Sequence, residues 1–199
     1  MPPRILSFAA LAAPLLMFGY GLFWLLDGQD GSHGPGFAWY AGHTLFFLSF
    51  LGYGALLLGL RRVTRGTPAA VLTGVGLAGV AAFLWVIATD LVPALDGAVE
   101  TPDLVMIAGP LLFEVGAVGL LILAVRRRLV PWWSPVVVTV GFLPIAASLS
   151  LLSVAAAIIL AGLWPFARTA GAHLREEVPP EVSYPEPVIR GESESGPRA

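Results

Sequence analysis

Five long apolar runs, separated by short polar connections, make up most of this chain. They cover residues 5–26, 39–60, 68–89, 102–125 and 135–164. Each run reaches the roughly 20 residues with which a helix crosses about 30 Å of hydrocarbon. Three of them begin with a hydroxyl residue followed by proline, which is a favoured start for a helix. The pattern predicts an all-α integral membrane protein, built as a five-transmembrane-helix up-down bundle.

The last run, 135–164, is longer than one crossing requires. As a single helix it would extend about 45 Å, so it must tilt or bend. Dividing it at Pro144 would leave a first piece that is too short to cross. We therefore predict one helix over the whole run.

Positive and negative side chains fall in different connections. The N-terminus and two connections carry arginine and no acid: Arg4, then Arg61, Arg62 and Arg65, then Arg126, Arg127 and Arg128. The other two carry acid and no arginine: Asp27 and Asp30, then Asp90, Asp96 and Glu100. The positive-inside rule then predicts a multi-pass protein of the cytoplasmic membrane with a cytoplasmic N-terminus. Five crossings put the C-terminus on the extracytoplasmic side.

Composition agrees with this class and limits the chemistry. The chain is 57% hydrophobic and only 12% charged, with a mean hydropathy of +0.82, as multispanning proteins are. It has no cysteine, which excludes disulfides and thiol chemistry, and its net charge of −2 gives no reason to expect nucleic-acid binding. All basic residues other than histidine are arginine, and Ala, Gly and Pro are abundant, which is typical of a high-GC bacterial genome.

The end of the chain has a different character. From residue 166 onward it is rich in Pro, Glu, Ser and Gly, and it cannot bury enough apolar surface to fold alone. This divides the chain into a transmembrane domain, 1–165, and a disordered tail, 166–199. The alternative for the tail is a Pro-rich docking segment for an extracytoplasmic partner.

Two patterns concern how the helices pack. Residues 41–61 and 108–128 match at several positions at a constant offset, including Gly42 with Gly109 and Gly52 with Gly119. This indicates two repeated helical hairpins followed by a fifth helix. Small residues at four-residue spacing predict helix contact faces, either within one chain or between subunits. These are Gly74, Ala78 and Ala82 in the third run and Ser153, Ala157 and Ala161 in the fifth.

Glu114 is the residue with the clearest functional signal, because it lies near the middle of the run 102–125. An ionised carboxylate at that depth costs at least about 2.5 kcal/mol, so we expect a protonated side chain with hydrogen-bond partners. Ser49 and Ser150, together with Ser148 and Ser153, have a matching depth. Glu114 is then either a proton-carrying group or a structural latch between helices.

His43 and Asp90 extend the proton-carrying hypothesis toward the acidic side of the protein. His43 lies about one turn inside the second run and could relay protons toward Asp90. About 10 Å of depth separates His43 from Glu114, so water would have to bridge them. The alternative is that His43 is an interfacial polar residue near Trp39.

The connection 27–36, DGQDGSHGPG, brings Asp27, Asp30 and His33 close together in sequence, with Asp96 and Glu100 as possible neighbours. Oxygen ligands of this kind can bind a divalent ion, but the spacing is not that of an EF-hand. We expect a solvated, Gly-rich turn with no metal and no cofactor.

The sequence carries no nucleotide-binding loop and no nucleophile elbow. The first hypothesis is a non-enzymatic multi-pass membrane protein in a structural, accessory or interaction role. Its partners would be the lipid bilayer and a second copy or a membrane complex. The second is a small proton-coupled carrier or channel with Glu114 as the titrating group. The third is an intramembrane acid catalyst that acts on a lipid-like substrate.

Overall fold

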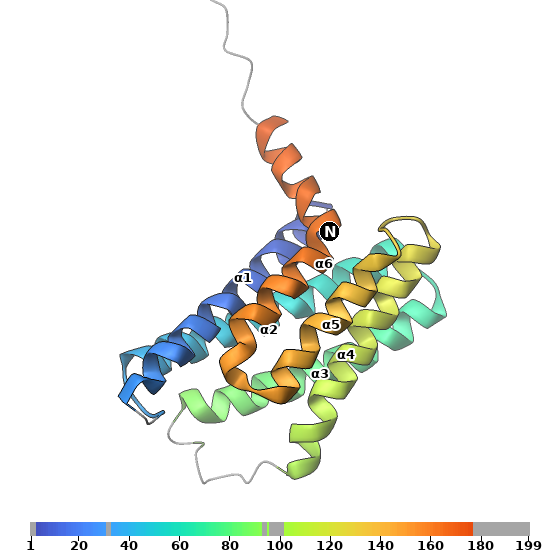
Figure 1. The fold of residues 1–199 in the computed structure, drawn as a ribbon. Helices are drawn as coiled ribbons and strands as arrows, with labels where there is room; N and C mark the ends of the chain where they lie inside the picture. The colour runs from blue at the N-terminus through green and yellow to red at the C-terminus, as the bar shows by residue number, and fades with distance from the viewer. Residues whose placement is uncertain (1–2, 31–32, 93–94, 96–101, 177–199) are drawn as a thin grey trace, which may run out of the picture.

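The computed structural model describes residues 3–30, 33–92, 95 and 102–176, and these residues form helices joined by turns (Figure 1). The α-helices are α1 Pro3–Asp27, α2 Phe37–Thr64, α3 Thr67–Leu91, α4 Asp103–Arg126, α5 Trp133–Ala147 and α6 Leu152–Glu176. Two short 3₁₀ turns, η1 Gly28–Asp30 and η2 Leu149–Leu151, follow α1 and α5.

In the described part of the chain, five helices are long and apolar enough to cross a bilayer. These candidate spans are Arg4–Asp27, Phe37–Thr64, Thr67–Leu91, Asp103–Arg126 and Leu149–Arg168. The first four agree with the predicted runs to within a few residues. The three hydroxyl-proline pairs mark helix starts to within two residues, since α3, α4 and α5 begin at Thr67, Asp103 and Trp133.

The prediction of one helix over 135–164 is wrong. The helix α5 ends at Ala147, and Ser148 adopts an extended conformation with φ −166° and ψ 137°. Its hydroxyl accepts a hydrogen bond from the backbone N–H of Ser150, which caps the turn that leads into α6. Pro144 contributes because it has no backbone N–H to continue the hydrogen-bond ladder. The chain therefore stops and reverses where a bent helix was expected.

Contacts between α5 and α6 show that the two helices are antiparallel. The Ser134 hydroxyl donates to the carbonyl of Gly162 over 2.6 Å, and Gly141, further along α5, lies against Ile159, which is earlier in α6. The first turns of α6 contact α1, where Ser153 donates to the carbonyl of Phe18. The helix α6 then runs back along α1 to the end of the bundle that holds the N-terminus (Figure 1).

The prediction of chain ends on opposite sides rested on one fifth helix, and the structure has two helices, α5 and α6, in its place. The sides of the membrane stay a prediction. The described chain leaves the bundle, at the end of α6, on the same side as the start of α1 (Figure 1). The predicted tail, 166–199, begins too early, because residues 166–176 continue α6. Its remaining residues, 177–199, lie outside the described residues.

Glycine sets the closest helix contacts. In the first hairpin, Gly52 of α2 lies against Ala13 of α1. In the second, Gly116 of α4 lies against the backbone of Gly76 in α3. Because glycine has no side chain, two backbones can approach closely there, which is how helices gain packing energy in lipid.

Two glycines matched by the internal repeat each contact the helix that comes before their own in the sequence. Gly42 faces Tyr20 and Phe23 of α1, and its counterpart Gly109 faces Ala82 of α3. Each glycine thus contacts the helix that precedes its own. The duplication itself stays a prediction that these positions support.

Most of the predicted small-residue positions do not pack within this chain, and their use between subunits stays a prediction. Gly74, Ala78, Ala157 and Ala161 are exposed, and the buried contacts of α3 are instead made by Gly76 and Gly79. Only Ala82, which contacts Gly109, and Ser153 pack as expected. Both helices carry small residues on more than one face, so spacing alone did not select the face that meets a neighbour.

Candidate functional site

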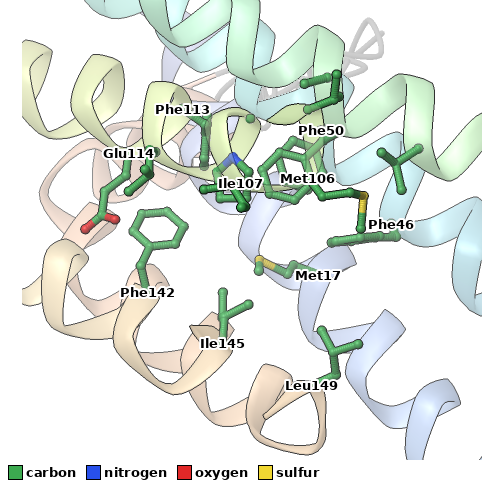
Figure 2. Close-up of a pocket in the computed structure, with 17 residues that line it drawn as sticks. Met17, Phe46, Phe50, Met106, Ile107, Phe113, Glu114, Phe142, Ile145 and Leu149 are labelled. Carbon is green, nitrogen blue, oxygen red and sulfur yellow. The ribbon is translucent and has the colours of Figure 1, made fainter. Parts of the chain in front are cut away.

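A cavity of about 600 Å³ lies among α1, α2, α3, α4, α5 and η2 (Figure 2). Its deep wall is aromatic, and Phe50 and Phe113 are almost completely buried. The phenylalanine rings pack on one another, with 4.0 Å between the centroids of Phe50 and Phe83 and 5.5 Å between those of Phe113 and Phe142. Met17 and Met106 add flexible thioether side chains to the lining.

The outer rim of the cavity consists of exposed apolar residues. Met106 is 53% exposed, Leu111 57% and Leu149 40%, and all three line the cavity. The space therefore reaches the molecular surface between α4 and the α5–η2 turn. In a membrane-inserted chain this surface would contact lipid hydrocarbon.

Proline lies in both helices that border the opening of the cavity, α4 and α5. Pro110 lies within α4 and Pro144 lies near the end of α5, and each removes one backbone hydrogen bond from its helix. Since α5 ends at Ala147, η2 rather than a further helical turn faces the first half of α4.

Glu114 lies at the edge of this cavity, next to Phe142 (Figure 2). Its side chain is half-buried. Within the described part of the chain, its carboxylate takes part in no hydrogen bond or ion pair. Among the described residues that line the cavity, it alone is ionisable.

None of the serines proposed as partners of Glu114 bonds to it, and the hydroxyls of Ser49 and Ser153 donate to other groups. Ser49 is fully buried and donates to the carbonyl of Ala13 over 2.8 Å. Ser150 lies in η2, where its backbone N–H is bonded to the Ser148 hydroxyl, and Ser153 donates to Phe18. The structure does not join Glu114 to any of them.

His43 and Asp90, in contrast, lie together. The Nε2 atom of His43 is 3.6 Å from a carboxylate oxygen of Asp90, and Nδ1 is 2.9 Å from the carbonyl oxygen of Trp39. If Nδ1–H donates to that carbonyl, Nε2 faces the carboxylate. The His43 side chain is only 4% exposed, whereas that of Asp90 is 39% exposed. The pair thus links a buried ring to the surface, in the direction that the relay hypothesis requires.

The pair is close to the cavity along both helices. Phe46 lies three residues after His43 in α2, and Val86 lies four residues before Asp90 in α3; both line the cavity. This places the pair about one helical turn beyond it. Glu114 reaches the same cavity from α4.

A second histidine–carboxylate pair joins two residues that the sequence grouped in the loop 27–36. The Nδ1 atom of His33 is 3.3 Å from a carboxylate oxygen of Asp27, which also accepts from the backbone N–H of Gly34. The His33 ring stacks on Trp24 at 4.0 Å. The sequence places Asp27 and His33 in one loop but gives no sign that the loop folds back onto α1.

The two pairs are connected by tryptophan. Trp39 contacts His43 with 4.0 Å between ring centroids, and Trp24 lies 6.3 Å from Trp39. His33, Trp24, Trp39 and His43 form a row of rings with a carboxylate at each end, the histidine row. The four-residue spacing of Trp39 and His43 is the sequence signal that puts them on one helix face.

Among the residues described, no three His, Asp or Glu side chains are arranged to hold a metal ion. Asp96 and Glu100, which the sequence suggested as neighbours of the loop 27–36, lie outside the described residues.

Comparison with protein-family models, curated proteins and solved structures finds no match to this chain.

Proposed function

We propose that this chain is a non-enzymatic multi-pass membrane protein that binds an amphipathic molecule from the bilayer. The observation that carries the proposal is the cavity of about 600 Å³, which has an aromatic wall and an apolar rim. Its volume is within the roughly 300–1,000 Å³ that is usual for small-molecule sites. The exposed rim residues Met106 and Leu111 would give a hydrocarbon chain direct access from the lipid.

Glu114 specifies the polar part of such a ligand. A carboxylate with no described partner, at the edge of an otherwise apolar site, matches a head group that carries a positive charge or hydrogen-bond donors. Nearby phenylalanine faces add a favourable field for a cation. A long-chain amine has both properties, whereas a fatty acid of the same length would place two carboxyl groups together.

The cytoplasmic membrane is the proposed location, with the arginine-bearing connections on the cytoplasmic side. The end of α6 is at the same end of the bundle as the start of α1 (Figure 1). We therefore place it on the cytoplasmic side as well.

Photo-crosslinking tests the proposal. The purified protein in lipid nanodiscs is exposed to a long-chain amine that carries a diazirine in its chain, and to the matching fatty acid. We expect the amine to label residues 105–114 of α4 and 142–149 of η2 and α5. We expect labelling by the acid to be several-fold weaker. Labelling that spreads evenly over the lipid-facing helices would contradict the proposal.

Two variants with one control make the test specific. Ile145→Trp puts a large ring into the cavity and is expected to remove most of the labelling. Val140→Trp adds the same ring on the same helix at an exposed site outside the cavity lining, and is expected to leave labelling unchanged. Glu114→Gln should remove the preference for the amine over the acid.

A proton-coupled carrier is the second candidate, and the position of His43 and Asp90 favours it. They connect the buried end of the histidine row with the surface, about one turn from the cavity. In that case Glu114 would exchange a proton for the ligand. Amine-driven proton flux in reconstituted vesicles, abolished by Glu114→Gln, would support the carrier. Binding without flux would support the non-transporting protein. Intramembrane acid catalysis is tested by the appearance of a lipid product in the same vesicles.

A further inference from the structure

A hollow of about 510 Å³ lies at the turn between α2 and α3, away from the cavity. Three arginines line it, Arg61 and Arg62 from the last turn of α2 and Arg65 from the connection. Arg65 and Gly66 have positive φ angles, 46° and 93°, which reverse the chain sharply. The Nε–H of Arg65 donates to the carbonyl of Arg62, so one guanidinium is tied to the end of α2.

The positive charge of the hollow is not neutralised by the side chains that the structure describes. Arg61, Arg62 and Arg65 make no ion pair within that part of the chain. Arginine binds phosphate through two parallel N–H groups and holds its charge at every physiological pH. Three such groups around one hollow favour a phosphate over a carboxylate or a halide.

The start of α3 adds a second contribution. Gly66 precedes the helix and has no side chain with which to cap it. The first N–H groups of a helix are without intrahelical partners and attract anions; in α3 they exclude Pro68, which has no N–H. The exposed Thr67, which also lines the hollow, adds a hydroxyl donor at the same place.

The hollow continues onto apolar surface. Leu58, one turn before Arg61 and Arg62, and Ala70, one turn after Thr67, complete its lining. Leu58 is partly exposed. A ligand with its phosphate at the arginines could therefore lay a hydrocarbon chain along α2 and α3 in the direction of the membrane interior.

We infer that the α2–α3 turn is a binding site for the phosphate group of an anionic phospholipid. The arginines and the start of α3 hold the phosphate, and Leu58 and Ala70 contact the glycerol and the start of an acyl chain. The site is independent of the amphipathic ligand proposed for the cavity.

Native mass spectrometry of the full chain, released from detergent, tests this inference. The probes are short-chain phosphatidylglycerol, short-chain phosphatidylcholine and inorganic phosphate as a competitor. We expect one tightly held phosphatidylglycerol. The triple variant R61Q/R62Q/R65Q should raise its Kd by more than about tenfold.

The turn between α4 and α5 supplies a matched control. It holds Arg126, Arg127 and Arg128 and lies at the same end of the bundle, since Gly119 near the end of α4 contacts Leu72 near the start of α3. R126Q/R127Q/R128Q removes the same charge and should change the Kd by less than about twofold. An equal loss in both triples would show only general attraction to positive charge and would overturn the inference.

A charge-neutral pair covers the case in which the triple variant fails to insert. Ala70→Trp fills the apolar part of the hollow and should weaken binding at least about fivefold. Ala78→Trp, at an exposed site of the same helix outside the hollow, should not. Unchanged binding in Ala70→Trp, or displacement of the lipid by inorganic phosphate at equal concentration, would overturn the assignment to a lipid.

Discussion

The two faces of α4 differ in how they meet their neighbours. On one face Gly109 and Gly116, seven residues apart, press against α3, where an added Cβ at Gly116 would collide with the backbone of Gly76. On the other face Ile107, Leu111 and Glu114 line the open side of the cavity toward α5. One helix thus carries the closest backbone contact of the second hairpin and the rim of the cavity.

In a membrane-inserted chain, this difference would decide which helix interface closes. Apolar side chains gain little from leaving hydrocarbon, so close packing supplies the stabilisation. Glycine facing glycine allows that packing between α3 and α4. Toward α5, α4 presents large residues to a helix that ends early at Ala147, and space remains. This space between α4 and α5 is the cavity in which we propose that a molecule from the bilayer binds.

The largest expected effect concerns the reversal that shortens α5. Because the chain has no cysteine, single cysteines can be placed at Leu129, Arg168 and Phe37 and labelled with an impermeant maleimide. If the reversal is right, positions 129 and 168 react from the same side of the membrane and position 37 from the other. If positions 168 and 37 instead react from the same side, residues 135–164 form a single membrane-spanning helix and the reversal is wrong.

Adding a side chain on the face of α4 that contacts α3 should destabilise the protein more than the other substitutions considered. Gly116→Leu forces α3 and α4 apart and is expected to lower the free energy of unfolding by about 3 kcal/mol. Gly74→Leu, on α3, is the control because a Cβ there meets nothing within 4 Å. Thermal unfolding in detergent measures both. Equal destabilisation would mean that the two faces of α3 do not differ as described.

Removal of one buried hydrogen bond should have an intermediate effect. Ser134→Ala deletes the bond to Gly162 that joins α5 to α6, and we expect a loss of about 1 kcal/mol. Thr139→Ala removes a bond within α5 to the carbonyl of Pro135 and should cost less. Unfolding in a graded series of denaturing detergent measures both. The reverse order would argue against the α5–α6 hairpin.

The smallest change in stability is expected on the face of α4 that lines the cavity. Glu114→Leu removes a carboxylate that has no described partner, so stability should change by no more than about 0.5 kcal/mol. A structural latch predicts a clear loss with Leu and recovery with Gln. The two variants, unfolded side by side, separate a latch from a ligand-binding group.

Sequence reasoning located the helices better than their partners. Hydroxyl-proline pairs marked three helix starts to within two residues, because the fixed φ angle of proline acts locally. The hydroxyls of Thr67 and Ser134 do not cap their helices, and Ser134 bonds to Gly162 instead. The direction from His43 toward Asp90 was also predicted, and the structure brings the two side chains to 3.6 Å. The serine partners of Glu114 were chosen by depth alone. Depth gives a position along the membrane normal but does not say which helices are adjacent, and Ser49 faces α1 instead.

The sequence by itself determined where this chain is apolar enough to cross a bilayer, where most of its helices begin and which connections carry arginine. These are properties of short segments. Only the tertiary structure decided that the chain turns back at Ser148. A proline at position 144 is compatible with a bent helix or with a stop, and the choice depends on distant contacts such as Ser134 with Gly162. The cavity beside Glu114 follows from the same reversal.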